Sequence, residues 1–282
     1  MSIIRDIACH CFSVETVDRF VVKKNRFKNR FKCLFAGLKY NLCNRRKIKT
    51  FNYYDIPIII NNFNRLGYLK KLINSLESRG YSNIYIIDNH STYPPLLEYY
   101  NDCPYTVFRL NKNVGFRAIW ETGIYEMFKQ NYYVYTDSDM EIDDSCPNDF
   151  MEYFVRILEK YPTTQKVGFG IRIDDLPDSY SNKYKVIKWE KQFWNNEVES
   201  GLYLAPIDTT FALYRPYCAG SADWNQKVIR TGTPYLIKHL PWYNLDEFKS
   251  EEIYYLSSLK TSTHWSAVNK ESLLLMKEEN QI

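Results

Sequence analysis

The sequence lacks any long apolar segment. No run of about eighteen or more apolar residues, the length that a membrane-spanning helix needs, occurs in its 282 residues. Its start also lacks the charged, then apolar, then small-residue pattern of a secretory leader. We therefore expect a soluble, cytoplasmic protein. With 45% hydrophobic residues, the chain is large enough to bury one sizeable core, in one domain or in two lobes of one domain.

The sequence also lacks cysteines at paired spacings. The seven cysteines are an odd number, and their spacing matches neither a disulfide framework nor a zinc site. Cys9-His10-Cys11 has no second pair of ligands at the distance that a zinc finger requires. Reduced, intracellular thiols are therefore expected.

Acidic residues are absent from residues 19–49, which hold twelve of the 37 Lys and Arg residues of the chain. Apolar side chains recur there at helical spacing, at Phe27, Phe31, Leu34, Phe35, Leu38 and Leu42. The pattern predicts a basic amphipathic helical arm over residues 1–50. Such a helix suits an anionic membrane surface, and it equally suits packing of its apolar stripe on the main domain. Binding to nucleic acid is not expected, because the remainder of the chain is acidic.

From residue 51 onward, short apolar runs alternate with stretches at helical spacing. Strands are expected at residues 56–60, 84–87, 106–110, 132–136 and 167–171, and helices at residues 69–79, 116–128 and 147–161. This alternation predicts an α/β domain with a mostly parallel central sheet flanked by helices. After about residue 172 the periodicity weakens and aromatic residues accumulate, which is typical of an irregular pocket wall.

Polar side chains follow three of the predicted strands. The first strand leads into Asn61-Asn62-Phe63-Asn64-Arg65, the second ends at Asp88-Asn89-His90-Ser91, and the fourth ends at Asp137-Ser138-Asp139. Ligands of open α/β sheets bind beyond the carboxyl ends of the strands, so these exits are expected to line one rim. Two carboxylates one residue apart can both face a hard divalent cation. The alternative is a turn and helix-start cluster with Asp143, Asp144 and Asp149.

Four segments in order resemble family-2 glycosyltransferases of the GT-A fold, namely residues 56–65, 86–91, 113–118 and 137–139. The resemblance implies a Rossmann-like GT-A domain with a nucleotide-sugar-binding half at residues 51–171 and an acceptor-binding half at residues 172–282. It implies that Asp88 accepts hydrogen bonds from the nucleotide and that Asn62 and Arg65 lie along it. Asp137 and Asp139 would serve metal and ribose, and Arg117 would neutralise phosphate charge.

The same resemblance implies an inverting reaction in which Mn²⁺ or Mg²⁺ stabilises the leaving diphosphate and a carboxylate removes the acceptor proton. Residues 208–214 resemble the strand before the acceptor segment, which makes Asp223 the first candidate for that base. Asp246 and Glu247 are its rivals. His239 resembles a histidine that completes the metal shell in many GT-A enzymes, with His264 as the alternative. Each of these can equally be a solvated acid or a structural histidine.

These features predict a glycosyltransferase that moves a sugar from a nucleotide-diphosphate donor, foremost a UDP-sugar, to a hydroxyl of a glycan or lipid-linked acceptor. Polysaccharide biosynthesis at the cytoplasmic face of a membrane is the expected setting. A sugar-phosphate nucleotidyltransferase is one alternative, but it needs a Gly-rich loop after the first strand, and residues 61–65 contain no glycine. A catalytically silent glycan-binding or membrane-binding protein is another, and the retained Asp88, Asp137 and Asp139 argue against it.

Overall fold

The computed structural model describes residue 35 and residues 52–220, 227–243 and 246–259. The basic arm predicted at residues 1–50, apart from Phe35, lies outside these described residues, as do Asp223 and His264. Among the residues that are described, no helix is long and apolar enough to cross a membrane.

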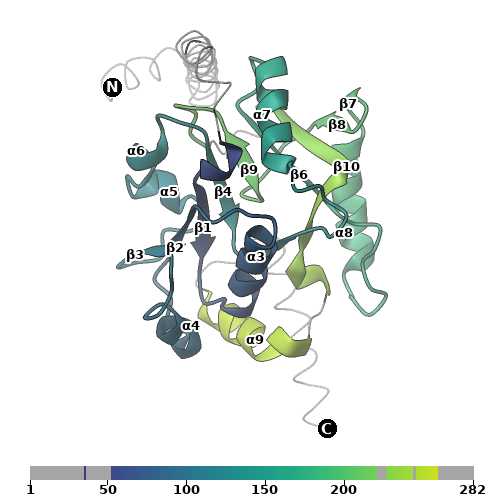
Figure 1. The fold of residues 1–282 in the computed structure, drawn as a ribbon. Helices are drawn as coiled ribbons and strands as arrows, with labels where there is room; N and C mark the ends of the chain where they lie inside the picture. Colours follow the sequence, from purple (N-terminus) through teal and green to yellow (C-terminus); the bar gives the residue numbers. More distant parts are fainter. Residues whose placement is uncertain (1–34, 36–51, 221–226, 244–245, 260–282) are drawn as a thin grey trace, which may run out of the picture.

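Within the described residues, one ten-stranded sheet forms the centre of the fold, and its first four strands are parallel (Figure 1). They lie in the order β3-β2-β1-β4, with β1 at Ile58–Asn62, β2 at Ile84–Asp88, β3 at Thr106–Arg109 and β4 at Tyr133–Asp137. Because these strands run in one direction, the carboxyl ends of β1, β2 and β4 meet at one edge of the sheet. The predicted α/β fold with a mainly parallel sheet is confirmed.

The second half of the sheet mixes directions. Its strands are β5 (Met140–Ile142), β6 (Lys166–Ile171), β7 (Glu197–Glu199), β8 (Leu202–Leu204), β9 (Ala212–Tyr214) and β10 (Val228–His239). β9 lies antiparallel between β4 and β6, and β10 runs parallel to β6. The pairing of β10 with β6 shifts register between Thr231 and Leu236, and β10 then pairs with β5 so that His239 lies opposite Met140. The last residue of β10 therefore sits beside the turn that follows β4.

Helices cover both faces of the sheet (Figure 1). In the described part of the chain, the α-helices are α3 (Gly67–Glu77), α4 (Pro94–Tyr99), α5 (Ala118–Glu121), α6 (Tyr125–Phe128), α7 (Phe150–Lys160), α8 (Lys183–Glu190) and α9 (Lys249–Ser258). Short 3₁₀ helices are η2 (Tyr53–Asp55), η3 (Lys191–Trp194), η4 (Leu240–Tyr243) and η5 (Asp246–Phe248).

The prediction of a single helix at residues 116–128 is wrong, because two short helices, α5 and α6, lie there. Gly123, at φ +80°, separates them, because a left-handed residue cannot continue a right-handed helix.

Alternating side chains of the parallel strands supply two cores. In β1, Ile58 and Ile60 point into the larger core, while Ile59 points into the smaller one on the opposite face. The larger core is rich in aromatic rings. Phe169 of β6 is fully buried there, with ring centroids 4.8 Å from Phe154 and 5.3 Å from Phe211.

The expectation of reduced thiols is wrong for one of the described cysteines. Cys103 and Cys146 are free, whereas Cys218 is in a disulfide. The odd cysteine count and irregular spacing gave no sign of this bond, because pairing is set by proximity in the fold.

Phe169→Ala is expected to lower the free energy of unfolding by about 3–5 kcal/mol, since it leaves a cavity between the ring of Phe154 on α7 and that of Phe211, which precedes β9. Urea denaturation followed by circular dichroism measures the change. Tyr184→Ala is the matched control, because Tyr184 on α8 is 77% exposed. This substitution should change the free energy of unfolding by less than about 0.5 kcal/mol. Equal effects of the two substitutions would contradict the core described above.

Candidate active site

The exits of β1 and β2 are joined by backbone and side-chain hydrogen bonds. The Asn89 amide donates to the carbonyl of Asn62 over 2.8 Å, and the Asn62 side-chain Nδ2 donates to the Tyr100 hydroxyl over 2.9 Å. The Oδ1 of Asn62 is buried with no hydrogen-bond partner among the described residues. Asp88 is 1% exposed and accepts a hydrogen bond from the Ser91 amide, with Arg109 Nε 3.6 Å from its second oxygen. The exits of β1 and β2 therefore each offer a buried hydrogen-bond acceptor, Asn62 and Asp88 respectively.

Asn89 also holds the segment that contains Asn113 and Gly115. Its Nδ2 donates to the Gly115 carbonyl and its Oδ1 accepts from the Val114 amide, both over 2.8 Å. Gly115 has φ +81°, a conformation that favours glycine. A hollow of about 300 Å³ opens here, lined by Lys112, Val114, Gly115, Phe116, Arg117 and Glu121. Arg117 lies on its wall, with its Nε 3.1 Å from a carboxylate oxygen of Glu121.

Asp137, the last residue of β4, is held by the segment before β9. Its amide donates to the Thr209 carbonyl over 3.0 Å, and its carboxylate accepts a hydrogen bond from the Thr209 hydroxyl. Burial, with the nearby carboxylate of Asp139 as the second cause, raises the pKa of Asp137 well above its ordinary value. Thr209 lies in the segment 208–214 that resembles the strand before the acceptor segment, but only the pairing of β9 with β4 shows that it contacts Asp137.

Asp139 lies between two cationic or polarisable groups. The Arg65 guanidinium forms an ion pair with its Oδ2, and His239 Nε2 lies 3.4 Å from the same oxygen. Burial alone would raise the pKa of Asp139, but His239 and Arg65 outweigh burial and hold that pKa well below its ordinary value. Neither Oδ1 of Asp139 nor Nδ1 of His239 has a hydrogen-bond partner among the described residues, although both are buried.

Arg65 is itself enclosed by α9, from the far end of the described chain. Its Nη2 donates to both carboxylate oxygens of Glu252, over 2.9 and 2.8 Å, and its guanidinium carbon lies 3.7 Å from the ring centre of Tyr255. The neighbouring Glu251 accepts hydrogen bonds of 2.7 Å from the amides of Leu66 and Gly67. Neither α9 nor Glu252 is predicted from the sequence, because no local pattern relates them to Arg65.

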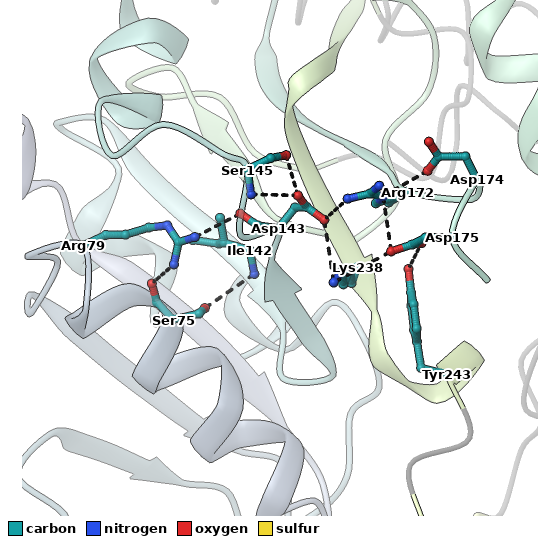
Figure 2. Close-up of polar contacts among 10 residues, drawn as sticks. All are labelled: Ser75, Arg79, Ile142, Asp143, Ser145, Arg172, Asp174, Asp175, Lys238 and Tyr243. Atoms are coloured by element: carbon teal, nitrogen blue, oxygen red, sulfur yellow. Dashed lines mark hydrogen bonds and ion pairs between the residues drawn. The ribbon is translucent and has the colours of Figure 1, made fainter. Parts of the chain in front are cut away.

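A second polar cluster braces the strand that carries His239 (Figure 2). The buried Asp143 accepts hydrogen bonds from Ser145 and from Arg172 Nη1, the latter over 2.8 Å, and Lys238 Nζ lies 3.8 Å away. Arg172 and Lys238 also pair with Asp175, which accepts from the Tyr243 hydroxyl over 2.6 Å. Asp143 is therefore a structural residue, and the cluster ties β5, β6 and β10 together.

The structure thus brings Arg65, Asp139 and His239 into contact, with Asn62, Asp88 and Asp137 on the same rim. The other candidates are less central. Arg117 lies in the hollow beside Glu121, Asp246 lies in η5, and Glu247 is an exposed residue whose carboxylate is 3.3 Å from Lys71 Nζ. Asp223 remains outside the described residues.

The donor set at Asp139 fits a divalent cation only in part. Among the described residues, no group of three or more His, Cys, Asp or Glu side chains is arranged to hold a metal ion. Asp139 and His239 nevertheless offer an oxygen and an imidazole side by side, and Asp139 Oδ1 is a buried acceptor with no partner in this part of the chain. Two protein ligands leave positions for the oxygens of a bound substrate and for water.

A mainly parallel sheet, flanked by helices and carrying amide and carboxylate side chains at the exits of β1, β2 and β4, is the organisation of a glycosyltransferase of the GT-A fold. The family model of Glycosyl transferase family 2 matches residues 58–217, more than half of the chain. The chain belongs to that family, and it is a glycosyltransferase.

Solved structures with a similar fold include S. aureus TarS and GalNAc-T7. TarS residues 1–349 align at 13% identity and a TM-score of 0.41, covering 75% of this chain and 68% of that one. GalNAc-T7, solved with UDP, GalNAc and Mn²⁺, aligns at 15% identity and a TM-score of 0.44, covering 65% of this chain but only 43% of its own. No curated protein sequence matches significantly.

The opposite pKa directions of the two aspartates predict opposite effects of their removal. Asp137→Asn should raise the free energy of unfolding at pH 7, by on the order of 1 kcal/mol, because a carboxyl whose pKa rises on folding costs stability once the pH exceeds its ordinary pKa. The gain should shrink as the pH falls toward 4.

Asp139→Asn should lower the free energy of unfolding at pH 7 by about 1.5–3 kcal/mol, because Arg65 loses a charged partner. The pKa of Asp139 is depressed on folding, so its contribution is present above the ordinary carboxyl pKa and is lost as the pH falls below it. Denaturant titrations of both variants at pH 4.5 and 7.5 measure the two effects. Changes of the same sign at pH 7.5 would show that the two environments are not as described.

Proposed function

We propose that this glycosyltransferase uses a nucleotide-diphosphate sugar, foremost a UDP-sugar, and transfers the sugar with inversion to a hydroxyl of a glycan or lipid-linked acceptor. The observation that carries the proposal is the 3.4 Å approach of His239 to Asp139, beside a buried and unpartnered carboxylate oxygen. Membership of Glycosyl transferase family 2 gives that geometry its chemical meaning.

In this proposal, Asp139 and His239 hold Mn²⁺ or Mg²⁺, with Asp137 beside them toward the metal or the ribose. A divalent cation supplies stabilisation of the negative charge that develops on the leaving diphosphate. Carboxylate oxygens suit either ion, and the imidazole of His239 favours Mn²⁺ over Mg²⁺, since magnesium prefers oxygen ligands.

The buried acceptors at the β1 and β2 exits suit the nucleoside. Asp88 and the Oδ1 of Asn62 are acceptors, so a bound group that donates hydrogen bonds, such as a base N–H or a ribose hydroxyl, is the complement they require. Arg65 and Arg117 are the proposed cations for phosphate oxygens. Both are paired with glutamates in this structure, and those pairs would have to rearrange.

The acceptor hydroxyl needs a carboxylate on the side of the sugar opposite the diphosphate. The oxygen of that hydroxyl attacks the anomeric carbon, its proton passes to the carboxylate, and the bond to the diphosphate breaks. Asp223 is the proposed base, with Asp246 and Glu247 as the other candidates. Glu247 would first have to leave its ion pair with Lys71.

Nucleotide-diphosphates, UDP foremost, should stabilise the full-length chain when Mn²⁺ is present, by about 2.7 kcal/mol at a hundred times the dissociation constant. A thermal-shift panel of UDP, GDP, ADP and TDP, each with and without Mn²⁺, measures this. Asp139→Asn and His239→Gln should abolish the part of the shift that depends on Mn²⁺.

Asp144→Asn is the matched control, because it removes an exposed carboxylate five residues from Asp139, and its shifts should equal those of the unaltered chain. If no nucleotide gave a shift, or if Asp139→Asn left the Mn²⁺-dependent shift intact, the proposed donor site would be wrong. A catalytically silent scaffold would then be the better account.

We further propose that the basic arm docks the enzyme on an anionic membrane, as an enzyme of polysaccharide biosynthesis with lipid-linked acceptors would require. Twelve Lys and Arg with no acid in residues 19–49 support this. The full-length chain should co-sediment with vesicles that contain anionic lipid, and a chain without residues 1–49 should stay in the supernatant. Unchanged co-sedimentation after the deletion would refute the docking role of the arm.

A further inference from the structure

Arg65 has two carboxylate partners from two distant elements. Asp139 belongs to the turn after β4, and Glu252 belongs to the first turn of α9, 187 residues along the chain from Arg65. The side chains of Arg65 and Glu252 are 7% and 16% exposed, so this pair is largely shielded from solvent. Two carboxylates against one guanidinium leave this group with an excess negative charge, which opposes the entry of an anion.

Helix α9 lies over the loops that leave β1 and β2, beside α4 (Figure 1). Besides the contacts of Glu251 with the amides at the start of α3, the Tyr254 hydroxyl donates to the Thr92 carbonyl over 2.9 Å. Asn64 Nδ2 donates to the Ser258 hydroxyl over 2.8 Å. The helix is thus attached to the same rim that carries Asn62 and Asp88.

The arrangement of Glu252 on Arg65 is one that a phosphate would adopt. A guanidinium binds carboxylate and phosphate oxygens in the same charge-assisted way, so the two groups compete for it. The Tyr255 ring at 3.7 Å covers one face of the guanidinium, which restricts ligands to its edges. At those edges, Nη1 of Arg65 donates to Asp139 and Nη2 donates to Glu252.

From this we infer that Glu252 is an internal competitor of the donor diphosphate, and that α9 is an autoinhibitory latch over the donor site. The inference rests on the function proposed above, in which Arg65 contacts the donor. A diphosphate that takes Arg65 displaces Glu252, and α9 loses its link to the Asp139 side of the rim. Glu251, Tyr254 and Ser258 keep α9 attached to α3 and to the β1 and β2 exits when Glu252 is released.

Glu252→Gln tests the latch, because it removes the competing charge and keeps the shape of the side chain. Titration calorimetry of the full-length chain with UDP, with and without Mn²⁺, should give a dissociation constant about tenfold lower for the variant, the change expected for about 1.4 kcal/mol. Hydrogen exchange of α9 should be faster in the variant without ligand, and faster in the unaltered chain once UDP and Mn²⁺ are added.

Glu152→Gln is the matched control, since it breaks a glutamate–arginine pair with Arg156 on α7, away from the rim, and should change neither measurement. If Glu252→Gln bound UDP as the unaltered chain does, or more weakly, the latch would be wrong while the proposed donor site stood. Slower exchange of α9 with UDP and Mn²⁺ would also overturn it, by making α9 part of the bound site. Failure of both chains to bind any nucleoside diphosphate would instead overturn the proposed function, and the latch with it.

Discussion

Burial of the Asp139 carboxylate is the constraint on which the rest of the rim depends. A buried carboxylate is costly unless it is paired, and here Arg65 from the β1 exit and His239 from the end of β10 supply the compensation. Arg65 in turn draws α9 onto the rim through Glu252. A single charge thereby sets the positions of three segments that are distant along the chain, and it leaves Asp137, with its raised pKa, to rely on Thr209.

Much of the fold around the four parallel strands follows from local pattern. The apolar runs near Ile58, Ile84 and Tyr133 are strands because each is short, rich in β-branched or aromatic residues and followed by polar residues. The periodicity at residues 116–128 misled, because apolar spacing continues across Gly123 although the backbone does not. The Asp-x-Asp turn and the acidic and amide exits were predictable for the same local reason, as they follow directly from strands.

The remaining contacts lie beyond the reach of sequence pattern. Glu252 meets Arg65 across 187 residues, and Thr209 meets Asp137 across 72, so no local spacing relates the partners. The strand that ends at His239 was not among the strands predicted from the sequence, since its exposed centre and mixed neighbours do not alternate cleanly. Tertiary packing determines which distant residues form ion pairs and how the strands of a mixed sheet are ordered. α9 has no strong apolar stripe from which its packing face could be predicted.

The register shift in β10 limits where residues can be inserted into or deleted from this chain. Successive residues of a strand face opposite sides, so the extra residues between Thr231 and Leu236 decide which side the His239 imidazole faces. A deletion or duplication of one codon in that stretch would turn the imidazole away from Asp139 without altering any side chain of the site. Surface loops elsewhere can accommodate an inserted or deleted residue. The number of residues in this bulge, in contrast, fixes both the position and the direction of His239 relative to Asp139.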